Sequence, residues 1–406
     1  MRRDFFITAL GIGIGQLIVL LATPFLVRIY TPGQFGQYAS LIALSSVIAT
    51  GASLRLDIAL PALHDEEFTT ISRLAFLLPV AVVPLICFLL PIRGLSAFSF
   101  FKGIESISLT QLWLVSCFQG MAAVAIGYCT RQGYFSTNAA IKILQPAIFV
   151  FTAMFWHAAG LENAVVISWI AAVAIGAIAL STVGWDKSWK GTLKAVTKKW
   201  EYPVISMPVA ILDTMTQALP LLFIVSVFGE DTGGNYSQMQ RLVAAPLLLT
   251  GVAISQVFYK HAGDLHRKNA SVFLLLRKTV MALAMIGVIL AIAVMLIGHP
   301  LMHLVLGDRW RTDTYFILLV LLPVVFRISV SPVTSIFLVC DRVALGAFWQ
   351  VTYFFSTFAV LTLSVRRFKL DDFLLVFVAS EFVMYSLYFV LADYSARNPR
   401  SKLLVG

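Results

Sequence analysis

The chain has 406 residues, of which 59% are hydrophobic and only 12% are charged, and its mean hydropathy is +0.89. Soluble domains carry about twice that share of charged residues, so a water-soluble fold is excluded. Within lipid, a backbone satisfies its own hydrogen bonds only as helices or as a closed barrel, and long apolar runs without alternation favour helices. The net charge of +10 comes from bases in short loops, where membrane topology explains it better than binding to nucleic acid.

Twelve apolar segments are long enough to be membrane spans, because a helix needs about 20 apolar residues to cross the hydrocarbon. They cover residues 5–27, 35–60, 74–90, 112–128, 139–156, 164–183, 204–228, 237–259, 272–297, 315–339, 345–365 and 373–391. The sequence therefore predicts an all-α integral membrane protein of about twelve transmembrane helices.

The bases are distributed unevenly on the two sides of these spans. If the N-terminus is cytoplasmic, 20 of the 30 Lys and Arg residues fall on the inner side. Because cytoplasmic loops are enriched in Lys and Arg, both termini are predicted to be cytoplasmic.

The longest hydrophilic stretch between spans, residues 186–202, divides the twelve predicted helices into six plus six. We expect an N-terminal lobe (1–185), a basic cytoplasmic linker (186–202), a C-terminal lobe (203–394) and a cytoplasmic tail (395–406). A weak internal repeat supports this division. A Gly-x-Tyr sequence begins the second helix of each half, at Gly36 to Tyr38 and at Gly234 to Tyr236.

A few ionisable residues lie within the predicted spans, and these are the candidate functional residues. They are Asp57, Asp213, Arg241, Arg327 and Glu381, with Arg55 near the inner end of the second span. Each costs about 2.5 to 3.5 kcal/mol at the bilayer centre unless it faces protein or water. Their presence in several spans predicts a polar, water-accessible interior between the helices.

Two interpretations of these charges remain open on the sequence alone. In the first, Arg241, Arg327 and Arg55 bind the phosphate of an anionic headgroup, for which a guanidinium offers a bidentate fork, and Asp213, Glu381 and Asp57 couple transport to H⁺ or Na⁺. In the second, the charges pair with one another and only hold helices together. Arg55 and Asp57, near the interface, could also extend into the headgroups.

No catalytic residues, cofactor or metal site are predicted. The six histidines show no ligand spacing, and the sequence has no Gly-rich phosphate loop and no nucleophile elbow. The four cysteines lie in or beside apolar runs without the paired spacing of a metal or redox motif. Membrane glycosyltransferases and polymerases generally expose a sizeable catalytic loop, whereas the predicted loops are at most about twenty residues long. A transporter is therefore expected, not an enzyme.

Four stretches of the sequence carry a resemblance to a known family. They are Gly15-Gln16 with Pro24 and Phe35-Gly36-Gln37-Tyr38; Arg55-Leu56-Asp57-Ile58-Ala59 with Asp65-Glu66-Glu67; Gly234-Asn235-Tyr236-Ser237 with Gln240-Arg241; and Gly307-Asp308-Arg309-Trp310 with Ser331-Pro332. Together they resemble the polysaccharide-transporter branch, the Wzx-type oligosaccharide flippases, of the multidrug/oligosaccharidyl-lipid/polysaccharide (MOP) exporter superfamily.

The resemblance implies a MOP/MATE-like fold with two six-helix lobes around a central cavity that opens alternately to either side. It implies transport of a polyprenyl-diphosphate-linked oligosaccharide, a repeat unit of the O-antigen (lipopolysaccharide) or exopolysaccharide type, across a bacterial inner membrane. The implied partners are this lipid-linked oligosaccharide, membrane lipids and the polysaccharide polymerase machinery, with no nucleic acid. The alternatives are an ion-coupled drug or small-solute antiporter of the same superfamily and a membrane glycosyltransferase or polymerase. The few intramembrane cations favour a surface polysaccharide over lipid II.

Overall fold

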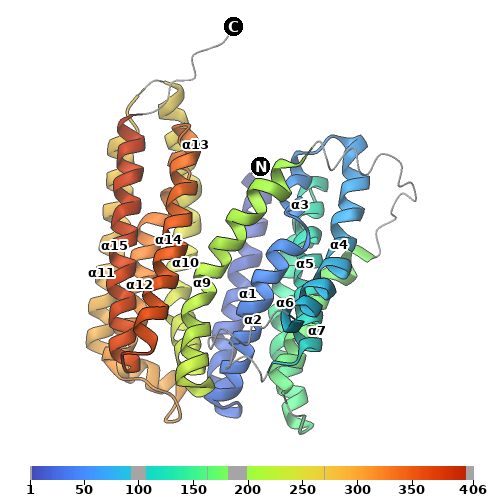
Figure 1. Ribbon diagram of the computed structural model, residues 1–406, viewed down its shortest axis with the longest axis vertical. Helices are drawn as coiled ribbons and strands as arrows, with labels where there is room; N and C mark the ends of the chain where they lie inside the picture. The colour runs from blue at the N-terminus through green and yellow to red at the C-terminus, as the bar shows by residue number, and fades with distance from the viewer. Residues whose placement is uncertain (1, 93–106, 162, 182–198, 269, 399–406) are drawn as a thin grey trace. The chain divides into compact units, whose positions relative to one another are not determined.

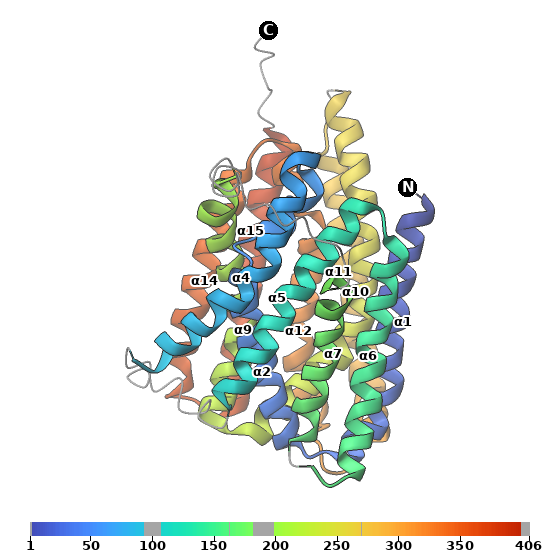
Figure 2. The same cartoon turned by 90° about the vertical axis from the view of Figure 1, so that its right-hand side faces the viewer.

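The computed structural model describes residues 2–92, 107–161, 163–181, 199–268 and 270–398, and these residues form helices without any β-strand. Ten of the helical segments are long and apolar enough to cross a membrane, and α7 (Ala164–Ser181) contains a shorter apolar helix. Figures 1 and 2 show the helices running roughly along a common direction within each half of the chain. The prediction of an all-α, multi-pass membrane protein is confirmed.

The first compact unit comprises Met1–Asn235. Its helices are α1 (Arg2–Ile29), α2 (Pro32–Ala52), α3 (Leu56–Ala59), η1 (Leu60–Ala62), α4 (Asp65–Ile92), α5 (Leu109–Gln132), α6 (Phe135–Ala158), α7, the π-helix η4 (Tyr202–Ser206), α9 (Met207–Phe228) and the start of α10 (Glu230–Arg267). The most extensive helix pair is α1 with α6, followed by α6 with α7 and α5 with α7.

The second compact unit comprises Tyr236–Gly406. It contains the rest of α10, then α11 (Phe273–Leu306), α12 (Thr314–Val330), η5 (Ser331–Val333), α13 (Ile336–Val339), α14 (Val343–Val365) and α15 (Leu370–Arg397). Helix α12 packs against both α11 and α15, and α14 packs on α15. The predicted linker and tail lie largely outside the described residues. The predicted lobe boundaries and the cavity between lobes therefore stay predictions.

Two of the predicted spans are not continuous helices. The span at 35–60 is broken between α2 and α3, where Leu54 (φ 52°) and Arg55 (φ 59°) adopt left-handed backbone conformations. The span at 315–339 is interrupted by η5, which contains Pro332 and therefore lacks one backbone donor. A rule that counts apolar residues cannot detect such breaks, because it carries no information on backbone dihedral angles.

Packing against α5 accounts for the break after α2. A Cβ atom on Gly127 would lie 2.4 Å from the backbone oxygen of Asp57, so only glycine allows this approach of the two backbones. Leu56 and Leu60, just after the break, are buried in a cluster that includes Val124 of α5. The apolar contact thus holds the short helix α3 in place.

Small residues also allow α1 and α6 to pack closely. Gly11 faces the backbone of Ala139, and a Cβ on Gly15 would lie 2.3 Å from the backbone oxygen of Lys142. The spacing of four residues puts both glycines on one face of α1. In lipid, where apolar burial does not drive helix association, such close backbone contact is a main source of packing energy.

The two Gly-x-Tyr sequences of the weak repeat pack their glycines against each other's helix. A Cβ on Gly36 would lie 2.0 Å from the backbone oxygen of Glu230, and a Cβ on Gly234 would lie 1.8 Å from that of Pro32. The amide Nε2 of Gln37 also donates a 2.8 Å hydrogen bond to Oε2 of Glu230. The starts of α2 and α10 therefore meet through equivalent positions of the repeat, all within the first unit.

We predict that Gly36→Ala lowers the free energy of unfolding by about 1 to 3 kcal/mol, because the new methyl group overlaps a backbone oxygen that cannot rotate away. Thermal unfolding of the purified protein in detergent measures this change. The control is Gly13→Ala on α1, whose Cβ would meet no atom within 4 Å. Equal stability of Gly36→Ala and Gly13→Ala would contradict the close contact between α2 and α10.

Candidate functional site

Arg327 and Glu381 are the two candidate charges that the structure brings together. Arg327 lies on α12 and Glu381 on α15, two helices that pack against each other in the second unit. Glu381 is only 3% exposed, whereas Arg327 is partly exposed. The two charges are close enough to interact electrostatically.

Two tyrosine hydroxyls connect these charges through hydrogen bonds. Nε of Arg327 donates to Oη of Tyr385 at 3.0 Å, and the Tyr385 hydroxyl donates to Oη of Tyr353 at 3.5 Å. The Tyr353 hydroxyl in turn donates to Oε1 and Oε2 of Glu381 at 2.8 and 3.0 Å. We refer to Arg327, Tyr385, Tyr353 and Glu381 as the tyrosine relay. It runs from the buried carboxylate on α15 to the guanidinium on α12.

The helices determine the geometry of the relay. Glu381 and Tyr385 are four residues apart on α15, so they lie on one face of that helix. Tyr353 comes from α14, where the ring of Trp349 stacks on it with a centroid distance of 4.7 Å. The indole Nε1 of Trp349 donates to the backbone oxygen of Met384 at 3.1 Å. Aromatic packing between α14 and α15 thus orients the Tyr353 hydroxyl towards Glu381.

Other polar groups lie inside the second unit. Tyr236, the tyrosine of the second Gly-x-Tyr sequence, is buried on α10 and within electrostatic range of Glu381 and Arg327. The side chains of Gln238 and Gln350 are also buried, and Oε1 of the first and Nε2 of the second have no hydrogen-bond partner among the described residues. Buried amide atoms of this kind are normally satisfied by protein, water or a ligand. Several polar groups are therefore buried within the otherwise apolar interior of this unit.

Sequence reasoning selected both ends of the relay but missed the tyrosines between them. Tyr385 could have been found from its spacing to Glu381, since residues four apart on a helix face the same way. Tyr353 could not, because it lies 28 residues away on another helix. In the structure, Arg327 and Glu381 are linked through two hydroxyl groups, and whether these charges bind an anion stays a prediction.

Arg55 and Asp57 lie at the break between α2 and α3. The hydroxyl of Ser53 donates to Oδ1 of Asp57 at 2.6 Å, and Nε of Arg55 is buried without a hydrogen-bond partner among the described residues. Nearby, in the acidic stretch of the family resemblance, Asp65 accepts a 2.6 Å bond from Arg131 of α5. Ser53 therefore holds the Asp57 side chain at the break, while the Asp57 backbone oxygen faces Gly127 of α5.

The remaining two candidates are Asp213 in the first unit and Arg241 in the second. Asp213 on α9 accepts a 3.0 Å hydrogen bond from Nε2 of Gln217, one turn later in the same helix. Arg241 lies on α10 in the second unit and is partly exposed. Within the part of the chain that the structure describes, no three His, Cys, Asp or Glu side chains cluster closely enough to hold a metal ion. Functional roles for Asp213 and Arg241 stay predictions.

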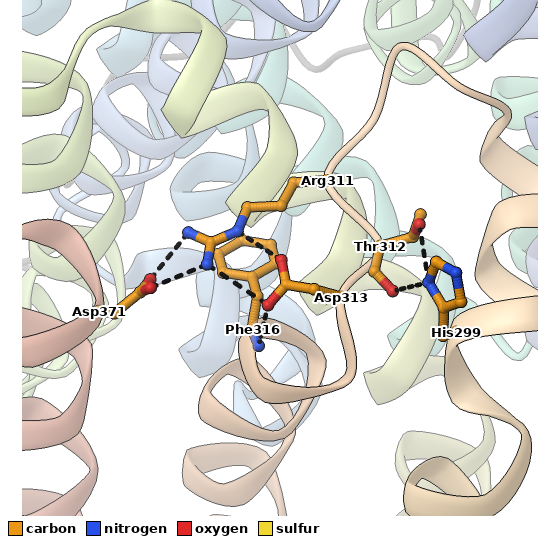
Figure 3. Close-up of polar contacts among 6 residues, drawn as sticks. All are labelled: His299, Arg311, Thr312, Asp313, Phe316 and Asp371. Atoms are coloured by element: carbon orange, nitrogen blue, oxygen red, sulfur yellow. Dashed lines mark hydrogen bonds and ion pairs between the residues drawn. The ribbon is translucent and has the colours of Figure 1, made fainter.

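An arginine in the loop before α12 joins the N-terminal ends of α12 and α15, as Figure 3 shows. Nε of Arg311 donates to Oδ1 of Asp313 at 2.6 Å, while NH1 and NH2 donate to the two oxygens of Asp371 at 2.7 and 2.9 Å. Asp313 also caps α12 by accepting a 3.0 Å bond from the backbone N–H of Phe316. The Arg311 network therefore helps to position the two helices that carry Arg327 and Glu381.

Hydrogen bonding shifts the pKa values within this network. The bonds to Asp371 raise the pKa of Arg311 above its ordinary value despite partial burial. Burial raises the pKa of Asp313, but the hydrogen bonds from Arg311 and from the Phe316 backbone outweigh it, so the net pKa of this carboxyl is below its ordinary value. Both groups are thus held in their charged forms at neutral pH.

Comparison with known protein families shows to which family the chain belongs. A family model described as "Polysaccharide biosynthesis protein" matches residues 25–313, which is well over half of the chain. The chain belongs to the polysaccharide biosynthesis protein family. This match confirms the resemblance carried by the sequence stretches, and no curated protein matches the chain.

Solved structures show which fold this polysaccharide biosynthesis protein has. The lipid II flippase MurJ, in an inward closed conformation, is similar with a TM-score of 0.64 at 13% identity, covering 96% of this chain and 87% of that one. An outward-facing multidrug resistance MATE family transporter of the MOP superfamily is similar with a TM-score of 0.55 at 13% identity, covering 98% of this chain and 96% of that one. A mutant of the Vibrio cholerae MATE transporter VcmN is similar with a TM-score of 0.54 at 12% identity, covering 97% of each chain. The fold is therefore that of the MOP superfamily, as predicted.

We predict that Tyr353→Phe destabilises the protein by about 1 to 3 kcal/mol, because the buried Glu381 carboxylate loses a hydrogen bond that no water replaces easily. Thermal unfolding in detergent measures the loss. Tyr394→Phe is the control, since this tyrosine is exposed on α15 and its ring contact with Arg342 survives the change. If both variants unfold at the wild-type temperature, the hydroxyl of Tyr353 does not stabilise Glu381.

We predict that acidification weakens the protein through Asp313. A carboxyl whose folded-state pKa lies below its unfolded value of about 3.9 stabilises the fold above that pH, and this contribution is lost as the pH falls through the folded-state pKa. The unfolding temperature of the wild type should therefore fall between about pH 5 and about pH 3 more steeply than that of Asp313→Asn. Asp372→Asn, which changes an exposed neighbour of Asp371, should retain the wild-type slope. Identical slopes for all three proteins would rule out a contribution from Asp313.

Proposed function

We propose that this protein is a flippase that moves a polyprenyl-diphosphate-linked oligosaccharide from the cytoplasmic to the periplasmic leaflet of a bacterial inner membrane by alternating access. The substrate class is a surface polysaccharide repeat unit of the O-antigen or exopolysaccharide type. The proposal includes two lobes around a central cavity and cytoplasmic termini. The observation that carries it is Arg327, whose guanidinium lies within a membrane-spanning segment and is held by the tyrosine relay.

The chemistry of the diphosphate matches such a guanidinium. An arginine at membrane depth is costly, so its retention requires a compensating interaction. A guanidinium binds two phosphate oxygens at once through parallel N–H bonds, which a lysine cannot do in the same geometry. Tyr385 holds Nε of Arg327, and this fixes the plane of the guanidinium. Arg241 and Arg55 are further candidates for the same headgroup.

We propose Glu381 as the coupling site. As a carboxylate it accepts both bonds from Tyr353, whereas a protonated Glu381 has a donor of its own. Protonation can therefore reverse the direction of donation along the two hydroxyls and change the bond that Tyr385 makes with Arg327. Carboxylate and hydroxyl oxygens also suit Na⁺, so H⁺ and Na⁺ are both candidate ions. Asp213 and Asp57 are alternative coupling sites.

Two other functions were predicted as alternatives. An ion-coupled drug or small-solute antiporter has support from the fold, because multidrug MATE transporters share it. The family match to polysaccharide biosynthesis favours the lipid-linked sugar. We do not propose a glycosyltransferase or polymerase, since the structures with this fold are named as transporters and a flippase. The proposal includes contact with the polysaccharide polymerase machinery.

Reconstitution in liposomes tests the proposal. A fluorescent polyprenyl-diphosphate oligosaccharide is placed in the outer leaflet, and its transfer is followed by the loss of accessibility to a membrane-impermeant quencher. We predict transfer by the wild type above empty vesicles and a 10- to 100-fold lower rate for Arg327→Ala, which corresponds to the loss of a charge-assisted hydrogen bond worth about 1.5 to 3 kcal/mol. Arg309→Ala, in an exposed loop, is the matched control and should transfer at the wild-type rate.

Each outcome separates the alternatives. Transport of ethidium, a cationic dye, without transfer of the lipid-linked sugar would support the antiporter and contradict the flippase. Transfer of the lipid-linked sugar by Arg327→Ala at the wild-type rate would exclude Arg327 as the headgroup ligand. No transfer by the wild type in either assay would count against transport by this protein alone.

A further inference from the structure

A second cluster of charges lies where α11 begins and α15 ends, apart from the relay. Nε and NH2 of Arg277 donate to Oδ1 and Oδ2 of Asp393 at 2.9 and 3.4 Å. Nε of Arg397 donates to Oδ2 of the same carboxylate at 2.9 Å. Both guanidinium carbons lie 4.4 Å from the centroid of the Phe273 ring. We call Arg277, Arg397, Asp393 and Phe273 the arginine pair site.

The carboxylate of this site is enclosed while the cations are accessible. The side chain of Asp393 is 14% exposed, compared with 43% for Arg277 and 52% for Arg397. One negative charge therefore fixes two positive ones and leaves a net charge of +1. Each guanidinium has five N–H donors, and Asp393 receives two bonds from Arg277 and one from Arg397. The site can thus offer further donors to a second anion.

A third arginine adds to the positive charge. Nε and NH2 of Arg342 donate to the backbone oxygen of Asn398, immediately after Arg397, at 3.3 and 2.9 Å. Its guanidinium also lies over the ring of Tyr394. Three guanidinium groups therefore surround the C-terminal end of α15, where the helix dipole already favours cations.

The surface next to the arginine pair site is apolar and exposed. The most apolar 18-residue window of α11 has a mean hydropathy of 3.0, yet only 17% of that window is buried within the protein. Leu274 and Met281 of α11, on either side of Arg277, are exposed, as is Val390 of α15. In a membrane protein such a surface faces acyl chains. Positive charge at the end of an acyl-facing surface is the arrangement that a phospholipid with an anionic headgroup would fit.

We propose that the arginine pair site binds the headgroup phosphate of an anionic phospholipid whose acyl chains lie along α11. The distribution of Lys and Arg predicts that the start of α11 and the end of α15 lie on the cytoplasmic side. Anionic lipids of the cytoplasmic leaflet attract basic clusters close to the membrane surface. Arg277 and Arg397 hold the phosphate oxygens, Asp393 orients both guanidiniums, and Phe273 packs against them. This site is independent of the transported substrate.

Native mass spectrometry of the full-length protein tests this proposal. The protein is released from detergent micelles that contain equal amounts of phosphatidylglycerol and phosphatidylcholine of the same chain length, and the bound lipids are counted. We predict preferential retention of phosphatidylglycerol by the wild type and at least a fivefold smaller preference for Arg277→Gln/Arg397→Gln, with the effect weakening as ionic strength rises. Arg267→Gln is the matched control, since this arginine is exposed and pairs with Asp264 on α10.

A third variant separates loss of charge from loss of structure. Asp393→Asn also disrupts the arginine pair site, but it raises the net charge of the site from +1 to +2. It should therefore retain phosphatidylglycerol at least as well as the wild type. Equal retention by the wild type and the double arginine variant, or equal weakening by Asp393→Asn and the double arginine variant, would overturn the proposal.

A soluble headgroup identifies the source of the phosphate. If glycerophosphate or inorganic phosphate at millimolar concentration displaces phosphatidylglycerol, the site recognises phosphate without the acyl chains, and the proposed lipid ligand is wrong. Persistence of the bound phosphatidylglycerol supports it. Lipid binding is measured without any transport assay. A negative binding result therefore leaves the proposed flippase function unaffected, and a negative transport result leaves the proposed lipid site unaffected.

Discussion

The need to satisfy charged groups at membrane depth is the constraint on which the arrangement of the second unit depends. Glu381 is buried within a membrane-spanning helix, where an isolated carboxylate would be costly. Tyr353 and Tyr385 meet this need by linking it to Arg327 on α12. Such a network is stable only while α12, α14 and α15 keep their relative positions. The same contacts that stabilise the helices therefore fix the positions of the two charges.

Contacts at the ends of the helices support this arrangement. Arg311 connects the N-terminal ends of α12 and α15, and the arginine pair site connects the start of α11 to the end of α15. Helix α15 is thus fixed near both termini by arginine–carboxylate bonds, with the tyrosine relay between them. Ion pairs at such positions border the headgroup region, where water lowers the cost of charge. The buried middle of the helix instead uses hydroxyl groups and one carboxylate.

The first unit depends on a different kind of contact. Gly11, Gly15, Gly36 and Gly127 each allow a backbone to approach another helix more closely than a Cβ atom permits. Two of these glycines, Gly15 and Gly36, belong with Tyr38 to the stretches that carry the family resemblance. Tyr38 stacks on Phe149 of α6 with a centroid distance of 5.3 Å. These motif residues therefore serve packing. This is why the family and fold follow from them more directly than the substrate does.

The sequence by itself determined that the protein lies in lipid, that its fold is all-α, and where nearly all of the helices are. Long apolar segments with few charged residues can be accommodated only as helices embedded in lipid. It also selected Arg327 and Glu381, since ionisable residues in apolar spans stand out. Only the tertiary structure decided that these two share a network and that Tyr353 joins it from another helix. The break at Leu54 and Arg55 was likewise hidden, as it depends on Gly127 of α5. Hydropathy along one helix carries no information about which faces of different helices meet.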